Sequence, residues 1–284
     1  MSHRIRRLIR YGLLRIPAPA RKRVEIGLLR SYEAFLRVRP GARPQGHEGP
    51  GADGLPLPPA KLRVLVSGTP DPTFFLETGR RQATFVRGML ERNGGSLDPG
   101  SAVLDFGCGC GRLARWWAEG TRASLYGCDP NRELVAWCRA SLPFMNAAVS
   151  EDRPPLPYPD ATFDFVYALS IFTHLPPEPE GAWMAELARV IRPGGHLLFT
   201  TAGEAYRDRL SGPERREYER GRPVVQFNTA AGTNLCIAYH PPEYVRGRMI
   251  EGFELREAFL APEHPAEADE ARLLQDSYLV RRRP

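Results

Sequence analysis

Apolar residues follow two different spacings along the middle of the chain. Short apolar runs, typical of buried strands, are followed by segments in which apolar residues recur every three or four positions, typical of amphipathic helices. Pro193, Gly194 and Gly195 are expected to form the turn between the last helix and the last strand of this region, because glycine tolerates a positive φ. Strands that alternate with helices indicate βαβ units and a parallel sheet. The expected strands are 102–106, 124–128, 147–149, 163–169 and 196–201, and the expected helices are 112–119, 131–141 and 183–191.

The pattern also predicts elements before this alternating core. Apolar residues at helical spacing among arginines predict two amphipathic helices near the start of the chain, separated by a proline break at 17–19. Residues 40–59 are rich in Pro and Gly and poor in apolar residues, which is typical of a linker. A short strand at 62–67 and a loop running into a helix within 74–93 are expected to follow.

After the core, the alternation is interrupted before two last strands. The stretch 224–244 breaks the βαβ order and is dense in hydrogen-bonding side chains. The runs 253–260 and 276–281 are expected to close the sheet, with a polar loop at 261–270 between them.

These patterns divide the 284 residues into two parts. A helical arm and linker over 1–60 precede one α/β domain over 61–284, which carries an insertion around 205–245. The net charge of +6 is unevenly placed, because residues 1–45 contribute +10 and leave −4 for the rest of the chain. The basic character therefore belongs to the arm, and the acidic domain argues against nucleic acid as a partner.

The basic arm has two interpretations. Its helices pack on the domain or on a second subunit with their arginines in solvent, or they lie on an anionic membrane surface. No run of about 18 apolar residues occurs in the sequence, so a membrane-spanning helix is not expected. The basic start has no convincing small-residue cleavage site, so a signal peptide is not expected either. The expected location is the cytoplasm, free or peripheral to the membrane.

Cysteine usage fits a reducing compartment. The five cysteines are odd in number, and Cys108, Cys110 and Cys128 fall within segments expected to bind a cofactor rather than in a disulfide framework. A single Cys-x-Cys without a second pair at ligand spacing is a poor zinc signature. No metal site is predicted.

The sharpest chemical feature is a glycine-rich turn. The expected strand 102–106 opens through Gly107, Gly109 and Gly111 into the next element. Glycines allow a tight turn and let a ligand approach main-chain atoms, and a following helix start offers oriented N–H groups. A dinucleotide-binding turn would need G-x-G-x-x-G, whereas here the third glycine comes one residue early and Arg112 holds the last position.

Asp105, two residues before the first glycine, completes an acidic-x-Gly-x-Gly-x-Gly pattern that resembles the class I S-adenosylmethionine-dependent methyltransferases. The stretch 156–168, Leu-Pro-Tyr-Pro-Asp-Ala-Thr-Phe-Asp-Phe-Val-Tyr-Ala, resembles the Leu-Pro-Phe-x-Asp-x-x-Phe-Asp-hydrophobic signature of that family. The resemblance implies an α/β fold with a seven-stranded, mostly parallel Rossmann-like sheet and helices on both faces. It also implies S-adenosylmethionine as the cofactor.

Two strand ends are expected to hold most of the cofactor. The resemblance implies that the glycine turn with Cys108 cradles the methionine and ribose portion, and that Asp105 holds the ammonium group, because a carboxylate pairs with a cationic amine. Asp129 and Pro130 end the next strand, 24 residues after Asp105. A carboxylate there accepts hydrogen bonds from both ribose hydroxyls. An Asp-Pro turn or a helix cap is the alternative for Asp129.

The loops after strands three and four complete the expected site. The resemblance implies that Glu151 or Asp152 pairs with the adenine amino group, and the spacing leaves both open. Leu169 and His174 follow strand four, in a loop expected to touch both cofactor and acceptor. His174 is the best-placed general base, because imidazole accepts protons near neutral pH. A packing or hydrogen-bonding role is the alternative for His174.

The insertion is expected to bind the acceptor. Asn234, Tyr239 and His240 are the predicted polar contacts for a hydroxylated acceptor, and the alternative is an inserted β-ribbon with a helix from Pro242. The layout is similar to bacterial methyltransferases associated with glycan and cell-surface polysaccharide synthesis. We therefore expect methyl transfer to a hydroxyl of a sugar, a glycolipid precursor or another small polar acceptor. The rival hypotheses are an RNA or protein methyltransferase, and a catalytically silent cofactor-binding partner subunit.

Overall fold

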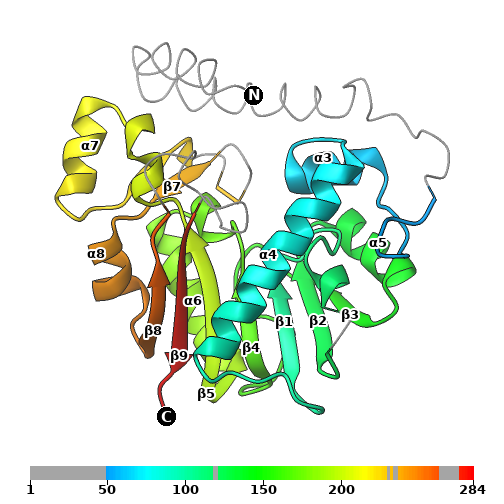
Figure 1. Cartoon of the computed structure of the whole chain (residues 1–284). Coiled ribbons are helices and arrows are strands. Elements are labelled where there is room, and N and C mark those ends of the chain that lie inside the picture. Colours follow the sequence, from blue (N-terminus) through cyan, green and yellow to red (C-terminus); the bar gives the residue numbers. More distant parts are fainter. Residues whose placement is uncertain (1–48, 118–120, 229–230, 233–235, 262–274) are drawn as a thin grey trace.

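The centre of the molecule is a seven-stranded β-sheet. The computed structural model describes residues 49–117, 121–228, 231–232, 236–261 and 275–284, and the expected helical arm lies outside them. The strands of the sheet are β1 (Ala102–Phe106), β2 (Ser124–Asp129), β3 (Met145–Val149), β4 (Phe163–Ala168), β5 (Ile191–Thr201), β8 (Phe253–Phe259) and β9 (Asp276–Arg282). Their order across the sheet is β3-β2-β1-β4-β5-β9-β8 (Figure 1).

Most strands run in the same direction, as the alternation of strands and helices predicts. Strands β1 to β5 pair in parallel, and β9 pairs antiparallel with both β5 and β8. The seven-stranded, mostly parallel sheet expected from the sequence is therefore confirmed. Parallel strands end at the same edge of a sheet, so the loops that follow β1, β2, β3 and β4 meet along one edge.

Helices cover both faces of the sheet, because neighbouring residues of each strand point to opposite faces. In β1, Val103 belongs to the cluster formed with α4 (Pro72–Arg92), while Leu104 belongs to the cluster formed with α6 (Pro177–Val190). Figure 1 shows α4 across one face of the sheet and α6 behind the other. Helices α3 (Ala60–Ser67) and α5 (Arg132–Ser141) lie towards the β2 and β3 end.

Residues 62–67 lie in helix α3, so the strand expected there is wrong. Gly68 ends the helix with φ 74° and donates its N–H to the carbonyl of Val64. The apolar residues at positions i, i+3 and i+4 of this helix pack into one small cluster, which is helical spacing rather than strand spacing. They are Leu62, Leu65 and Val66. Pro59 before the helix and Gly68 after it are start and stop signals that outweigh the β-branched composition.

The helix expected over 112–119 is also wrong as far as the described residues extend. The chain forms only a short 3-10 turn, η1 (Ala114–Trp116). Leu113, Ala114, Arg115 and Trp117 are all buried. An amphipathic helix buries one stripe, so a segment buried on nearly every side does not fit that pattern.

Two further expectations need correction at their boundaries. Helix α4 begins at Pro72, where the Asp71 side chain caps it by accepting the N–H of Thr73 at 2.9 Å, so no loop occupies the start of 74–93. The expected turn at Pro193–Gly195 lies inside β5, where the pairing with β4 shifts by a bulge. Gly194 does take the positive φ expected of it, at 78°.

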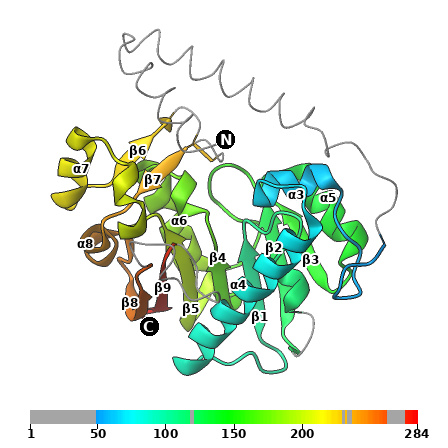
Figure 2. The ribbon, with the colours of Figure 1, turned by 45° about the horizontal axis from the view of Figure 1, so that its top comes forward.

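Between β5 and β8 the chain leaves the sheet and forms a group of further elements, called the insert below, which ends with Val245 and Met249 packed in the main core on the α6 side. Its elements are η3 (Glu204–Arg209), α7 (Gly212–Glu219), β6 (Val224–Gln226), β7 (Ile237–Tyr239), α8 (Pro242–Tyr244) and the π-helical turn η5 (Val245–Met249). Strands β6 and β7 pair antiparallel and α8 begins at Pro242, which is the β-ribbon and helix named above as the alternative for this stretch. Figure 2 shows the ribbon beside α7. A bridge between Ala202 and Tyr239 joins the insert to the end of β5.

Among the helices that the structure describes, none has the length and apolar character needed to cross a membrane.

Candidate functional site

The glycine turn follows β1 directly, at the edge where the parallel strands end. Gly107, Gly109 and Gly111 have φ values of 79°, 55° and 74°, a region that other residues rarely occupy. The N–H groups of Gly107 and Cys108 donate to the carbonyl of Cys128 at 2.8 and 3.0 Å, which ties the turn to the end of β2. A side chain at Gly107 would collide with Ile171. The turn therefore requires glycine both for its conformation and for its close contacts.

Asp129 holds the turn from the end of β2. Its Oδ2 accepts the N–H of Gly109 at 3.0 Å and its Oδ1 accepts the N–H of Asn131 at 2.8 Å. Burial raises the pKa of the Asp129 carboxyl. Pro130, the next residue, is exposed. The structure thus brings Asp129 against the glycine turn, as the sequence predicts.

Asp105 lies one strand away from Asp129 and is buried. Its pKa is raised to about 7, chiefly by burial; a hydrogen bond from Tyr167 and the charge of Arg112 lower it, and the charge of Asp129 raises it. Tyr167 is the residue of β4 that pairs with Asp105 across the sheet. Two buried carboxyl groups close together disfavour each other's ionisation, and a cationic group beside them would favour it.

The two acids after β3 lie near the same edge. Glu151 and Asp152 are exposed, and Ser150 before them donates its N–H to the carbonyl of Asp129 at 3.2 Å. The structure therefore places both acids next to the end of β2. Nothing in their contacts selects one of them.

The loop after β4 forms the opposite wall of the site. Leu169 is half-buried and packs against the core on the α4 face, and Ile171 faces Gly107. His174 ends the short 3-10 helix η2 (Phe172–His174). Its Nδ1 lies 2.7 Å from the carbonyl oxygen of Cys236. A carbonyl oxygen only accepts hydrogen bonds, so Nδ1 carries a proton, and in the neutral ring Nε2 is the nitrogen that accepts one.

The predicted acceptor contacts have a different setting from the cofactor residues. Tyr239 is buried and donates its hydroxyl to Oε1 of Gln226 at 3.3 Å. His240 is fully buried, and its Nε2 lies 2.6 Å from Oε2 of Glu180, a residue that sequence reasoning did not single out. Asn234 lies outside the described residues. The insert thus engages Tyr239 and His240 with its own and neighbouring side chains.

Helix α3 and the chain before it cover the turn from outside, which the sequence did not predict. The Cγ2 of Val66 would lie 2.7 Å from a Cβ at Gly109. Asp53, within the expected linker, forms a buried ion pair with Arg115 of η1, and its Oδ1 accepts from the guanidinium at 2.8 Å. The only signals for this cover in the sequence were Pro59 and Gly68, which stand directly before and after α3.

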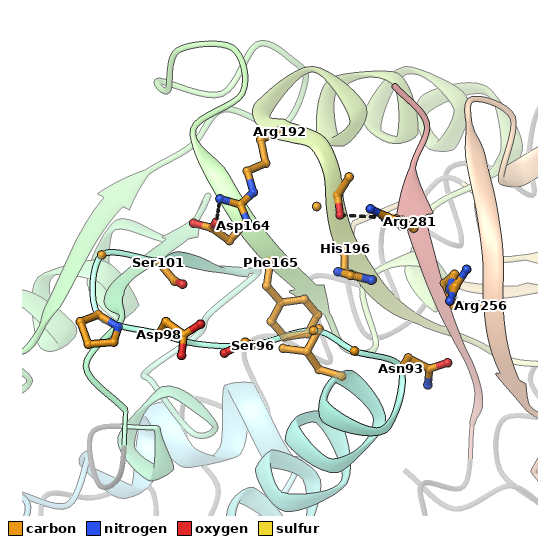
Figure 3. A pocket seen from close by; sticks show the side chains of 17 residues that line it. Asn93, Ser96, Asp98, Ser101, Asp164, Phe165, Arg192, His196, Arg256 and Arg281 are labelled. Atoms are coloured by element: carbon orange, nitrogen blue, oxygen red, sulfur yellow. Dashed lines mark hydrogen bonds and ion pairs between the residues drawn. The ribbon is translucent and has the colours of Figure 1, made fainter.

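A cavity of about 740 Å³ lies at the other edge of the sheet, between the loop after α4 and the starts of β4 and β5 (Figure 3). Its arginines are each engaged: Arg192 pairs with Asp164, Arg281 donates to the carbonyl of Gly194 at 3.1 Å, and Arg256 pairs with Glu254 outside the cavity. Ligands of parallel sheets bind where the strands end. This cavity is therefore separate from the glycine turn.

Potential metal ligands do not gather anywhere in the part of the chain that the structure describes. All five cysteines are buried free thiols. Burial raises the pKa of the Cys128 thiol, and the thiol of Cys108 has its pKa raised by a hydrogen bond with Cys138 and by burial. Thiols with raised pKa values are poor nucleophiles and poor metal ligands.

Comparison with known proteins relates this part of the chain to methyltransferases. Residues 104–199 match a family described as Methyltransferase domain. "Methyltransferase GfsG" of Streptomyces halstedii is 35% identical over 138 residues, which are 46% of this chain and 47% of that protein. "Malonyl-[acyl-carrier protein] O-methyltransferase" of Serratia marcescens is 32% identical over 151 residues, 51% of this chain and 55% of that protein.

The chain thus spans about half the length of these relatives, at 47% and 55%. A similar fold is found in the crystal structure of a putative S-adenosylmethionine-dependent methyltransferase from Listeria monocytogenes. That structure has a TM-score of 0.52 and 13% identity, covering 72% of this chain and 99% of that one. The matched residues 104–199 include the glycine turn, Asp105, Asp129 and His174, whereas the insert lies beyond them.

Proposed function

We propose that this chain is an S-adenosylmethionine-dependent methyltransferase that transfers a methyl group to an oxygen of a small acceptor molecule. The observation that carries the proposal is the glycine turn with Asp105 and Asp129 at the ends of β1 and β2. The match of residues 104–199 to a methyltransferase domain supports it, because that match includes the same residues.

The residues at this edge of the sheet fit the methyl donor. Asp105 is a buried carboxyl whose pKa is raised to about 7, and a ligand ammonium group would stabilise its charged form. Asp129 already accepts two N–H groups and has further lone pairs for ribose hydroxyls. The glycines, Cys108 and Pro130 would surround the methionine and ribose, with Leu169 on the opposite wall and Glu151 or Asp152 near the adenine.

The donor supplies a methyl group on a positively charged sulfur, which makes the sulfur a good leaving group. The protein then has to align the acceptor oxygen with that methyl group, and proximity and orientation supply much of the rate. An acceptor hydroxyl also has to lose its proton. We propose that His174 takes it on Nε2, because the Cys236 carbonyl keeps Nδ1 protonated.

For the acceptor we propose a hydroxyl of a sugar or another small polar molecule, next to the insert. The name of the Serratia marcescens relative says that it is an O-methyltransferase, which supports transfer to oxygen. Asn234 stays a predicted contact. Tyr239 and His240 are engaged within the protein, so we propose that they hold the insert in place and act on the acceptor only through it.

The first test is calorimetric titration of the purified protein with S-adenosylhomocysteine, the demethylated product of the donor, and with NAD as the control. We expect saturable binding of S-adenosylhomocysteine and no binding of NAD, because the turn lacks the third-glycine spacing of dinucleotide sites. Binding would justify an acceptor screen that starts with sugars and glycolipid precursors. Absence of binding, or binding of NAD instead, would overturn the proposed function.

A further inference from the structure

Ser170 has a backbone conformation that is unusual for a residue with a side chain. Its φ is 59°, in the left-handed region, two residues after the end of β4. For L-residues other than glycine this conformation brings the Cβ close to the following carbonyl oxygen and costs free energy. Such a residue keeps its conformation only when surrounding contacts hold it there.

Hydrogen bonds hold Ser170 at each of its polar groups. Its N–H donates to Oγ1 of Thr200 at 2.8 Å, and its carbonyl accepts the hydroxyl of Thr173 at 2.9 Å. Its own hydroxyl donates to Oε1 of Gln275 at 3.0 Å. The first two bonds come from neighbouring elements of the same sheet edge, whereas the third comes from a residue 105 positions away.

Gln275 also binds the element that supports Ser170. Its Oε1 accepts the hydroxyl of Thr200 at 2.6 Å, so both lone pairs of that oxygen are used. One amide side chain thus joins the loop after β4 to the end of β5.

The conformation of Ser170 determines the position of Leu169 and Ile171, the two residues of the loop after β4 that form the wall opposite the glycine turn. Ile171 follows it directly and covers Gly107, and Leu169 precedes it. A left-handed residue reverses the local course of the chain, so a change to an extended conformation at Ser170 would carry Ile171 away from the turn. Gln275 is therefore linked to the candidate donor site through Ser170 and Ile171 and does not itself contact the glycine turn.

We propose that Gln275 is a positioning residue that keeps Ser170 in its left-handed conformation and thereby fixes the wall formed by Leu169 and Ile171 around the methyl donor. This inference rests on the proposed function, since the ligand of that wall is the donor proposed above. The role is distinct from a contact with donor or acceptor, because Gln275 acts only on the conformation of Ser170.

The test compares S-adenosylhomocysteine affinity and the urea midpoint of unfolding in matched variants. Gln275→Met keeps the length of the side chain and removes its hydrogen bonds, and Ser170→Ala removes the hydroxyl but keeps the Cβ. We expect each to raise the dissociation constant about tenfold, since a lost hydrogen bond and a less populated backbone conformation act together. Gln226→Met, a buried glutamine of the insert, is the control and should leave the affinity within about twofold.

The decisive variant is Ser170→Gly, because glycine adopts the left-handed conformation without steric cost. We expect Gln275→Met to raise the dissociation constant less than about twofold in the Ser170→Gly background. It should still lower the urea midpoint there, because the bond from Thr200 to Gln275 is lost in either background. An equal loss of affinity in both backgrounds, or no loss in either, would overturn the inference. Failure of the unmodified protein to bind would instead overturn the proposed function, so the two failures are distinguishable.

Discussion

At the scale of single residues, Asp129 has a structural role beside the ligand-binding role proposed for it. Its two oxygens accept the N–H groups of Gly109 and Asn131, so the carboxylate fixes the turn before any ligand arrives. The bond to Asn131 also lies at the start of α5, where Asn131 caps the helix. Asp129 is therefore a turn residue, which is the alternative that the sequence left open. Its remaining lone pairs are available to ribose hydroxyls.

We expect Asp129→Ala to weaken S-adenosylhomocysteine binding by ~1 to 3 kcal/mol, because ribose hydroxyls and the Gly109 N–H lose their acceptor. Calorimetry measures the change. Asp160→Ala is the matched control, since Asp160 is an exposed acid that pairs with Arg189 outside the site. An unchanged affinity in Asp129→Ala would remove Asp129 from the donor site.

The site residues that the sequence predicts are those that lie close together along the chain. Asp105 and the three glycines form one short motif, and Asp129 follows it at the next strand end. The Gln275 to Ser170 bond spans 105 positions and the Arg115 to Asp53 bond spans 62, so only tertiary packing creates them. The burial of side chains was not visible in the sequence either: Tyr239 and His240 were predicted as polar contacts for the acceptor, and both are buried against other side chains of the protein.

At the scale of elements, the segment from Asp53 to α3 acts as one cover over the glycine turn. Its anchor is the ion pair between Asp53 and Arg115, whose side chains are 3% and 0% exposed. A second pair, Lys61 with Glu133, joins α3 to α5 at 2.8 Å, but both side chains are about half exposed, at 44% and 53%. The two pairs connect the same cover to the domain in opposite environments.

We expect Asp53→Ala to lower the free energy of unfolding by ~3 to 5 kcal/mol, because it leaves the Arg115 charge buried without a partner. Glu133→Ala should cost under ~1 kcal/mol, since exposed pairs contribute little. Urea denaturation compares the two variants. Equal losses would show that burial does not distinguish these ion pairs, and recovery of stability in the double variant Asp53→Ala with Arg115→Met would confirm the unpaired charge as the cause.

Helices and strands were predicted correctly where the apolar pattern of a segment agreed with its burial in the fold. The strand 102–106 is apolar on both faces because helices cover both sides of it, and such runs are typical of parallel sheets. At 62–67 β-branched residues suggested a strand, but the flanking proline and glycine and the packing of Leu62 with Val66 select a helix. At η1 burial on nearly all sides removed the periodicity on which helix prediction depends.

At the scale of the whole molecule, two buried carboxyl groups make stability depend on pH. Burial raises the pKa of both Asp105 and Asp276 to about 7. Asp276 is fully buried at the start of β9, where its Oδ1 accepts the N–H of Ala261 at 2.9 Å. Between about pH 4 and 7 the folded protein keeps protons that the unfolded chain has released, so these groups favour folding at low pH and lose that contribution as pH rises towards 7.

We expect the free energy of unfolding of Asp276→Asn, relative to the unmodified protein, to rise between pH 5 and about 7 and to level off above that, because the amide has no charge to bury. Denaturant titrations across this range measure the difference. Using a difference matters, because burial and nearby arginines lower the pKa of His196, which acts in the opposite direction below pH 6.5. A difference that does not change with pH would contradict the raised pKa of Asp276.

The order of strands in the sheet also determines when the protein can finish folding. Strand β9 follows β8 along the chain but lies between β5 and β8, and it is the neighbour to which β8 is hydrogen-bonded. A ribosome therefore delivers β8 before the strand that must separate it from β5. Until β9 emerges, the nascent domain displays an unpaired β5 edge, which is a template for aggregation. Completion of this sheet thus waits for β9, which follows all its other strands along the chain, and the β5 edge needs protection from aggregation until β9 has paired with it.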